Sequence, residues 1–153
     1  KDASPDILDA SATSPAPGEV LVSVLYSGGD GTASPELLAK VAAIVTDPGI
    51  RPLGDHVTVA SATVIPYEIN AKLITFAGPD PDLIVAAARA ALTTFLADNR
   101  KLGRAITRTG ITTALSPAGV HRVDLDLVAD IVCSMSQVAN CQTITVTHGG
   151  YAS

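Results

Sequence analysis

Aromatic residues and charge are both scarce in this chain. Phe, Trp and Tyr make up 3% of the 153 residues and charged residues 16%, whereas 47% are hydrophobic. The core must then be built from Ala, Val, Leu and Ile, whose small branched side chains pack between helices and a sheet. So little charge argues against disorder outside the chain ends, and the length suits one domain or two small lobes. We therefore expect a globular chain with a layered α/β-type architecture, which the order of the elements below narrows to the α+β class.

Basic charge, cysteine and long apolar runs are scarce as well. Ten Lys and Arg against fifteen Asp and Glu leave a net charge of −5, which gives no field suited to phosphate backbones and argues against a nucleic-acid partner. Two cysteines need not form a disulfide framework. No apolar run reaches the roughly 18 to 20 residues of a membrane span, and no secretion signal is evident. The chain begins at Lys1 rather than Met, so we expect a piece of a longer polypeptide.

Six segments have the composition or the alternation of β-strands. Residues 19–26 are β-branched and apolar on both faces, as in a central strand covered on both sides. Residues 67–76 alternate between apolar and polar side chains, which is typical of a strand with one wet face. The predicted strands cover residues 7–12, 19–26, 56–64, 67–76, 120–127 and 142–148, with Pro66 separating the third from the fourth.

Three helices are predicted from capping residues and apolar spacing. Ser34 supplies an N-cap hydroxyl before a first-position proline, and the helix stops before Pro48-Gly49. Asp80 opens the strongest helix, which carries a continuous apolar stripe and is expected to end at Gly103. A shorter helix is expected over residues 107–115.

The order of these elements predicts a particular fold. It suggests a ferredoxin-like split βαβ sandwich with an extra N-terminal and an extra C-terminal strand. Residues 1–18 are then a linker or strand from a preceding domain, residues 19–127 the α+β sandwich, and residues 128–153 a C-terminal strand extension.

The loop Gly28–Thr32, with the sequence Gly-Gly-Asp-Gly-Thr, is a candidate phosphate-binding site. Glycines between a strand and a helix let backbone N–H groups approach an anion, and these five letters look like a signature of the lipid and NAD kinase superfamily. However, Ser34 stands where a dinucleotide motif needs its third glycine, Asp30 puts a carboxylate inside the loop, and no P-loop lysine follows. We favour a structural turn, with a nucleotide-binding enzyme as the alternative.

Histidines and cysteines show no spacing typical of a metal or redox site. His56, His121 and His148 fall on different predicted strands, so a metal site would need the fold to gather them. Cys133 and Cys141 are separated by seven residues, which matches neither a zinc ribbon nor a redox motif. We predict no catalytic, cofactor-binding or metal-binding residues and no cofactor.

Two aspartate pairs and one basic cluster have structural explanations. Asp124 and Asp126 mark the solvent face of an alternating strand, and Asp80 and Asp82 form an N-cap with first-turn charge. The basic cluster consists of Arg100, Lys101, Arg104 and Arg108. We expect these cations to complement the C-terminus of the long helix, and they also suit docking to an acidic neighbouring subunit.

An ordered set of phrases resembles the C-terminal part of the baseplate assembly protein J family of Mu-like and related contractile-tailed phages and tailocins. The phrases are Asp9–Leu25, Gly29–Ser34, Arg51–Val59, Leu102–Arg104, Gly119–Val123 and Ile144–Thr147. They are collinear over about residues 5 to 149. In this family the glycine loop simply connects a strand to a helix, and no catalytic residue carries over.

The resemblance implies a structural function without enzymatic activity. It implies a virion protein of the baseplate wedge, assembled in the bacterial cytoplasm in several copies around the tail hub, on phage, prophage or tailocin particles. The implied partners are other wedge proteins, the tail-fibre-attachment protein and copies of itself, with no nucleic acid and no membrane insertion. A baseplate module of a related secretion or injection system is a further alternative.

Overall fold

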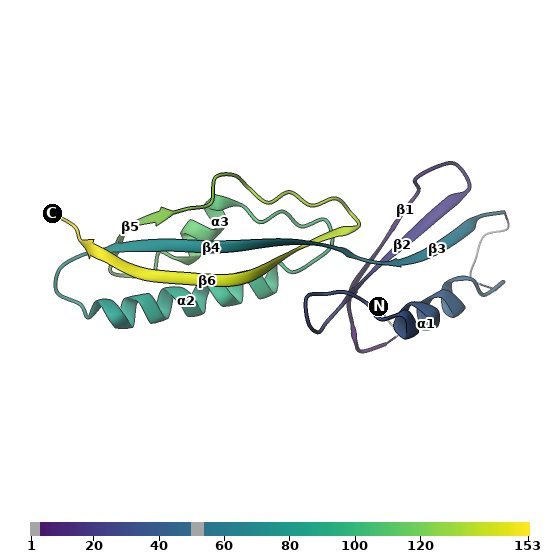
Figure 1. Cartoon of the computed structure of the whole chain (residues 1–153), viewed down its shortest axis with the longest axis horizontal. Helices are drawn as coiled ribbons and strands as arrows, with labels where there is room; N and C mark the ends of the chain where they lie inside the picture. Colours follow the sequence, from purple (N-terminus) through teal and green to yellow (C-terminus); the bar gives the residue numbers. More distant parts are fainter. Residues whose placement is uncertain (1–3, 50–53) are drawn as a thin grey trace. The chain divides into compact units, whose positions relative to one another are not determined.

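The computed structural model describes residues 4–49 and 54–153. They form two compact units (Figure 1), each described by itself below. The first comprises residues 4–49, 54–65, 101–104 and 133–140, and the second residues 66–100, 105–132 and 141–153. Three helices and two three-stranded sheets occur within the described residues, which confirms the α+β class.

The first unit is built on a mixed sheet with the strand order β1-β2-β3. β1 (Ile7–Thr13) pairs antiparallel with β2 (Glu19–Tyr26), and β2 pairs parallel with β3 (His56–Ser61). The crossover between the parallel strands contains α1 (Pro35–Val45), whose cap Ser34 accepts a hydrogen bond from the Leu37 N–H. The predicted N-terminal hairpin, central strand and capped helix are therefore confirmed.

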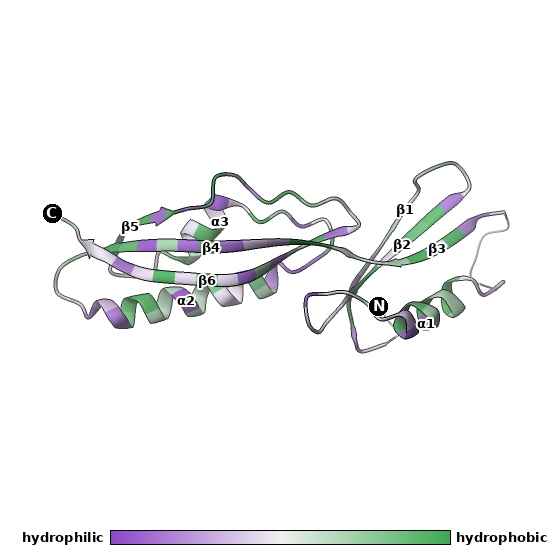
Figure 2. Cartoon of the chain, viewed as in Figure 1, coloured by the Kyte–Doolittle hydropathy of each residue, from purple (hydrophilic) through white to green (hydrophobic). Residues whose placement is uncertain are grey.

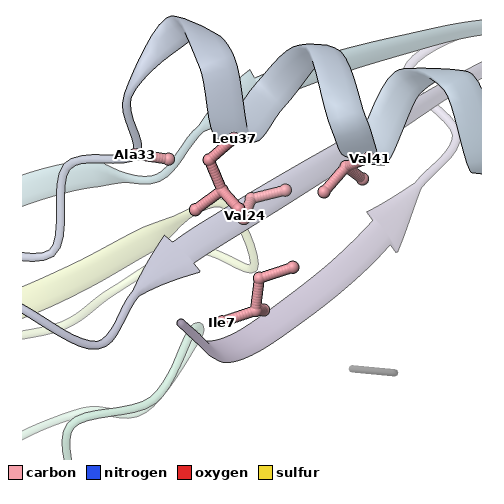
Figure 3. Close-up of a cluster of buried hydrophobic side chains, with 5 residues drawn as sticks. All are labelled: Ile7, Val24, Ala33, Leu37 and Val41. Atoms are coloured by element: carbon pink, nitrogen blue, oxygen red, sulfur yellow. The ribbon is translucent and has the colours of Figure 1, made fainter. Parts of the chain in front are cut away.

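Branched apolar side chains join α1 to this sheet. Figure 3 shows Val24 of β2 and Ile7 of β1 beneath Leu37 and Val41 of the helix, with Ala33 at the helix entrance. All five are buried. A second cluster contains Leu25 and receives side chains from residues far along the sequence, namely Leu102 and Val138.

Segments from the second half of the sequence are hydrogen-bonded into the first unit. The carboxylate of Asp9 accepts the Leu102 N–H at 3.0 Å, and the hydroxyl of Ser11 donates to the carbonyl of Met135. These bonds tie residues 101–104 and 133–140 to β1, a connection that no local pattern in the sequence predicted.

The second unit contains the sheet β5-β4-β6 and two helices. β4 (Thr63–Thr75) and β6 (Gln137–Tyr151) begin in the first unit and continue here, while β5 (Val120–Leu125) pairs antiparallel with β4. Figure 2 shows hydrophobic and hydrophilic residues alternating along β4, and the apolar ones, among them Ile69 and Leu73, are buried. The helices are α2 (Pro81–Asp98) and α3 (Arg108–Ala114).

Several predicted boundaries are wrong. The break between β3 and β4 falls at Ala62 rather than at Pro66, because the hydrogen-bond partner changes there: Ala62 N–H donates to the Val24 carbonyl and Thr63 N–H to that of Ser136. A proline is tolerated within a strand where the ladder does not need its N–H. β5 ends two residues earlier than predicted, and β6 extends further in both directions.

The strands do not form the single sheet of the predicted ferredoxin-like sandwich. Because β3 pairs with β2 and β4 pairs with β5 and β6, the strands divide into two sheets of three. The predicted segments 1–18, 19–127 and 128–153 do not follow the two units either. β1 belongs to the first unit's sheet, and residues 133–140 and 141–153 fall in different units.

α2 ends at Asp98, five residues before the predicted stop at Gly103. The side chain of Asn99 caps the helix by donating to the Phe95 carbonyl at 2.8 Å. The predicted apolar stripe is only partly buried. Ile84, Ala88 and Leu92 are covered, whereas the opposite face, which includes Leu83, is exposed.

Candidate functional site

The Gly28–Thr32 loop uses its own backbone N–H groups to hold its shape. The Gly31 N–H donates to the Gly28 carbonyl at 3.1 Å, and the Thr32 N–H donates to the carboxylate of Asp30 at 2.9 Å. The next N–H, of Ala33, donates to the hydroxyl of Ser61 on β3 at 2.9 Å. An anion would have to displace these acceptors, so the geometry favours a turn that positions α1.

The surroundings of this loop are poorly suited to a phosphate. A small hollow of about 250 Å³ beside it is lined by Asp6 and Glu36 as well as by Lys40. Two carboxylates would repel an anion at the start of α1 and offset the favourable helix dipole. A Cβ at Gly28 would lie 2.7 Å from the ring of Tyr26, so a larger residue there would require that ring to move.

The histidines serve separate contacts. His56 begins β3 in the first unit. In the second unit, the ring of His121 packs edge-on against Phe76 at 5.1 Å, and His148 lies 3.1 Å from the hydroxyl of buried Thr75. Residues 4–49 and 54–153 contain no group of three or more His, Cys, Asp or Glu that could hold a metal ion.

Both cysteines are free thiols with pKa values shifted away from reactivity. Burial raises the pKa of Cys133, which lies in the first unit, and burial also raises the pKa of Cys141 in the second. A raised pKa lowers the fraction of nucleophilic thiolate at neutral pH. These thiols therefore behave as small apolar side chains.

Three of the four paired aspartates have the structural positions that were predicted for them, and Asp126 lies beyond the strand on which it was expected. Asp80 is the N-cap of α2 and accepts the N–H of Asp82, the acidic residue of the first turn, at 3.0 Å. Asp124 is exposed and forms an ion pair with Arg122 at 2.8 Å, which raises the pKa of that guanidinium. Asp126 follows β5 and is exposed.

The basic residues follow the last turn of α2 rather than lying within it, and their complementing of the helix C-terminus stays a prediction. Because the helix ends at Asp98, its last turn contains no basic residue. Lys101 and Arg104 belong to the first unit, and Arg100 and Arg108 belong to the second. Arg108 is the first residue of α3, and its backbone N–H donates to the carboxylate of Asp130 at 2.8 Å.

A polar groove of about 670 Å³ lies on the second unit and was not predicted as a site. Its charged lining residues have both signs: Lys72 and Arg108 face the same space as Asp124 and Asp126. Thr145 and Thr147 of β6 complete the polar lining. The alternation of polar residues in three strands was the available signal, but the sequence did not show which strands were neighbours.

Several apolar side chains are exposed on the second unit. Leu83 on α2, Val128 and Val132 after β5, and Tyr151 at the end of β6 are all exposed. Within the described residues, no helix is both long and apolar enough to cross a membrane. Apolar side chains exposed singly are normal on a protein surface, so these positions do not by themselves mark a site.

Two consecutive parts of the chain match models of known protein families. Residues 1–61 match the model of the Baseplate J-like central domain, and residues 67–147, more than half of the chain, match that of the Baseplate J-like protein C-terminal domain. The boundary between the two matches falls where β4 passes from the first unit to the second.

A relative with a known name supports the same assignment. The chain is 40% identical over 145 residues to baseplate protein J of Escherichia phage P2, an alignment that covers 94% of this chain and 48% of the relative. The chain thus spans about half the length of that protein. The predicted resemblance is confirmed, and the chain belongs to the family of baseplate J-like proteins.

Proposed function

We propose that this chain is a structural component of a contractile phage-type tail baseplate, acting as a wedge protein that assembles around the tail hub without enzymatic activity. The single observation that carries the proposal is the match to two consecutive domains of the baseplate J-like family, in order and over most of the chain. The 40% identity with the phage P2 protein extends through both.

The geometry supports a mechanical role. Each unit has its own apolar core, built around Val24 and Leu37 in the first and around Leu73 and Leu92 in the second. Such cores hold surfaces in fixed positions, as an assembly subunit requires. The Gly28–Thr32 loop contributes to this rigidity, because the N–H groups of Gly31 and Thr32 bind acceptors within the loop.

The proposed partners are other wedge proteins, the tail-fibre-attachment protein and further copies of the chain. Contacts of this kind need sufficient apolar area with a polar rim rather than a deep cleft. The proposed location is the tail baseplate of the virion, after assembly in the cytoplasm of the bacterial host.

Purified particles test this proposal. The gene is deleted from the strain that encodes it, contractile particles are induced, and their composition is measured by mass spectrometry. We expect the polypeptide in wild-type particles and no complete tails after deletion. Complete particles that lack the polypeptide would contradict the role, and capsid genes beside the gene would separate a phage from a secretion system.

A further inference from the structure

β6 is a long edge strand that itself carries little of the usual protection against pairing. It forms one edge of the sheet β5-β4-β6 and contains no charged residue and no proline over its fifteen residues. Natural edge strands are commonly short, charged or interrupted by proline, because open main-chain groups invite another strand. β5, at the opposite edge, fits that pattern, since it has six residues and carries the ion pair of Arg122 and Asp124.

The main-chain groups on the open side of β6 can be identified from one hydrogen bond. The Ile144 carbonyl accepts from the guanidinium of Arg89 on α2 at 2.6 Å, so it faces away from β4. Alternate residues of a strand direct their N–H and C=O groups to the same side, so those of Gln142, Val146 and His148 face the open edge as well. A carbonyl oxygen has two lone pairs, and that of Ile144 can therefore accept a second bond.

The sequence along this edge is complementary to itself. Residues 143–147 read Thr-Ile-Thr-Val-Thr, which is symmetric about Thr145 in the alternation of threonine and β-branched apolar residues. In an antiparallel pair of two such strands centred on Thr145, Ile144 stands opposite Val146 of the second copy, and threonines stand opposite threonines. Thr–Thr and β-branched pairs stabilise antiparallel strands, and β6 itself contributes no charged side chain to the pair.

The neighbouring side of α2 permits the same approach. Arg89 reaches the edge of β6, and the exposed residues three or four positions from it on the helix are small or uncharged: Ala86 and Thr93, with Ala90 beside them. A two-fold axis through Thr145 would set α2 of one copy beside α2 of the other and bring their Arg89 side chains near the same axis, a like-charge contact that salt screens. Small side chains let two helices pack closely.

We propose that two copies of this chain pair antiparallel through β6 about Thr145, which joins their second sheets into one continuous sheet. This inference deepens the assembly function proposed above and rests on it, since it names a second copy of the chain as one partner and β6 as the contact. The charged edge of β5 remains free for other neighbours.

Charge-swap variants of the 153-residue chain test the pairing. Sedimentation velocity at about 0.15 M salt, which screens the repulsion between two chains of net charge −5, should show a reversible dimer for the wild type. Thr145→Lys and Thr145→Glu each place like charges opposite one another across the axis and should each weaken dimerisation about three- to tenfold. Mixing the two variants should restore the dimer, because Lys then faces Glu.

A matched control separates pairing from general surface charge. Asn70→Lys adds the same charge to an exposed position of β4, one strand away from the edge, and should leave the dimer unchanged. Far-UV circular dichroism verifies that each variant is folded. A wild type that stays monomeric up to about 1 mM, an equal loss in the control, or no recovery on mixing would each overturn the β6 contact.

Failure of this contact and failure of the baseplate role are distinguishable. A monomeric chain that is still found in purified particles would remove the β6 pairing and leave the assembly role standing. A chain that dimerises in solution but is missing from the particles would remove the assembly role and leave the β6 pairing standing.

Discussion

Two leucines on α2 look equivalent in the sequence, yet the structure predicts very different effects when each is shortened. Leu92 is 0% exposed and Leu83 is 70% exposed, although both belong to the apolar stripe expected from helical spacing. The perturbation is the same in each case, a change to alanine within one helix. Differences in helix propensity therefore largely cancel between the two variants.

The magnitudes follow from burial. Leu92→Ala removes about three buried methylene-sized groups, worth about 0.8 kcal/mol each, and leaves a cavity, so the free energy of unfolding should fall by about 3 to 5 kcal/mol. Leu83→Ala removes atoms that are mostly in water and leaves no enclosed cavity. Its expected cost is about 0.5 kcal/mol or less.

Hydrogen exchange measured by mass spectrometry is the suitable assay, because it reports the stability of β4 within the second unit separately from that of the first. Leu92→Ala should lower the opening free energy of the β4 amides by about 3 to 5 kcal/mol, and Leu83→Ala should leave that free energy nearly unchanged. Equal losses in the two variants would refute the assignment of the buried face of α2.

Three further results are expected. Gly119→Ala should destabilise the chain more than Gly54→Ala. Both glycines have a φ near +100°, but only at Gly119 would the added Cβ lie 2.7 Å from the side chain of Ile84. Equal unfolding midpoints for the two variants would contradict this packing. Burial raises the pKa of Cys133, so the folded state favours the neutral thiol, and this contribution to stability is complete below the pKa of the unfolded state and is lost as the pH rises through the pKa of the folded state. A disulfide reagent should therefore modify Cys133 more slowly than it modifies a free thiol at pH 8. Equal rates would contradict the burial of this thiol. Calorimetric titration with ATP and with NAD should give no binding heat, and heat that Gly31→Val abolishes would revive the nucleotide-binding alternative.

Local signals predicted the elements well where a residue acts on its immediate neighbours. Ser34 and Asp80 cap the two longer helices as expected, because a cap needs only an N–H two or three residues away. The alternation of β4 likewise predicted its buried face. In contrast, Pro66 was expected to divide two strands, but the division at Ala62 depends on Val24 and Ser136, which are distant in sequence.

The candidate surfaces were harder to predict than the elements. The sequence could show that β6 has no charge, but not that it lies at a sheet edge, because strand order depends on pairings between residues far apart in the chain. The same limit applies to the apolar stripe of α2, whose spacing does not show that Leu83 lies outside the core. The hydrogen bond from the Leu102 N–H to the carboxylate of Asp9 in the first unit likewise joins residues that no local sequence pattern connects.

The most direct test of the central claim is a residue-resolution cryo-electron microscopy map of the intact particle made by the strain that encodes this chain. A structural assembly role predicts that both units are present in several copies around the tail hub, with their outer surfaces against neighbouring baseplate proteins and the Gly28–Thr32 loop without a bound nucleotide. A complete baseplate whose density is fully explained without this polypeptide would contradict the account.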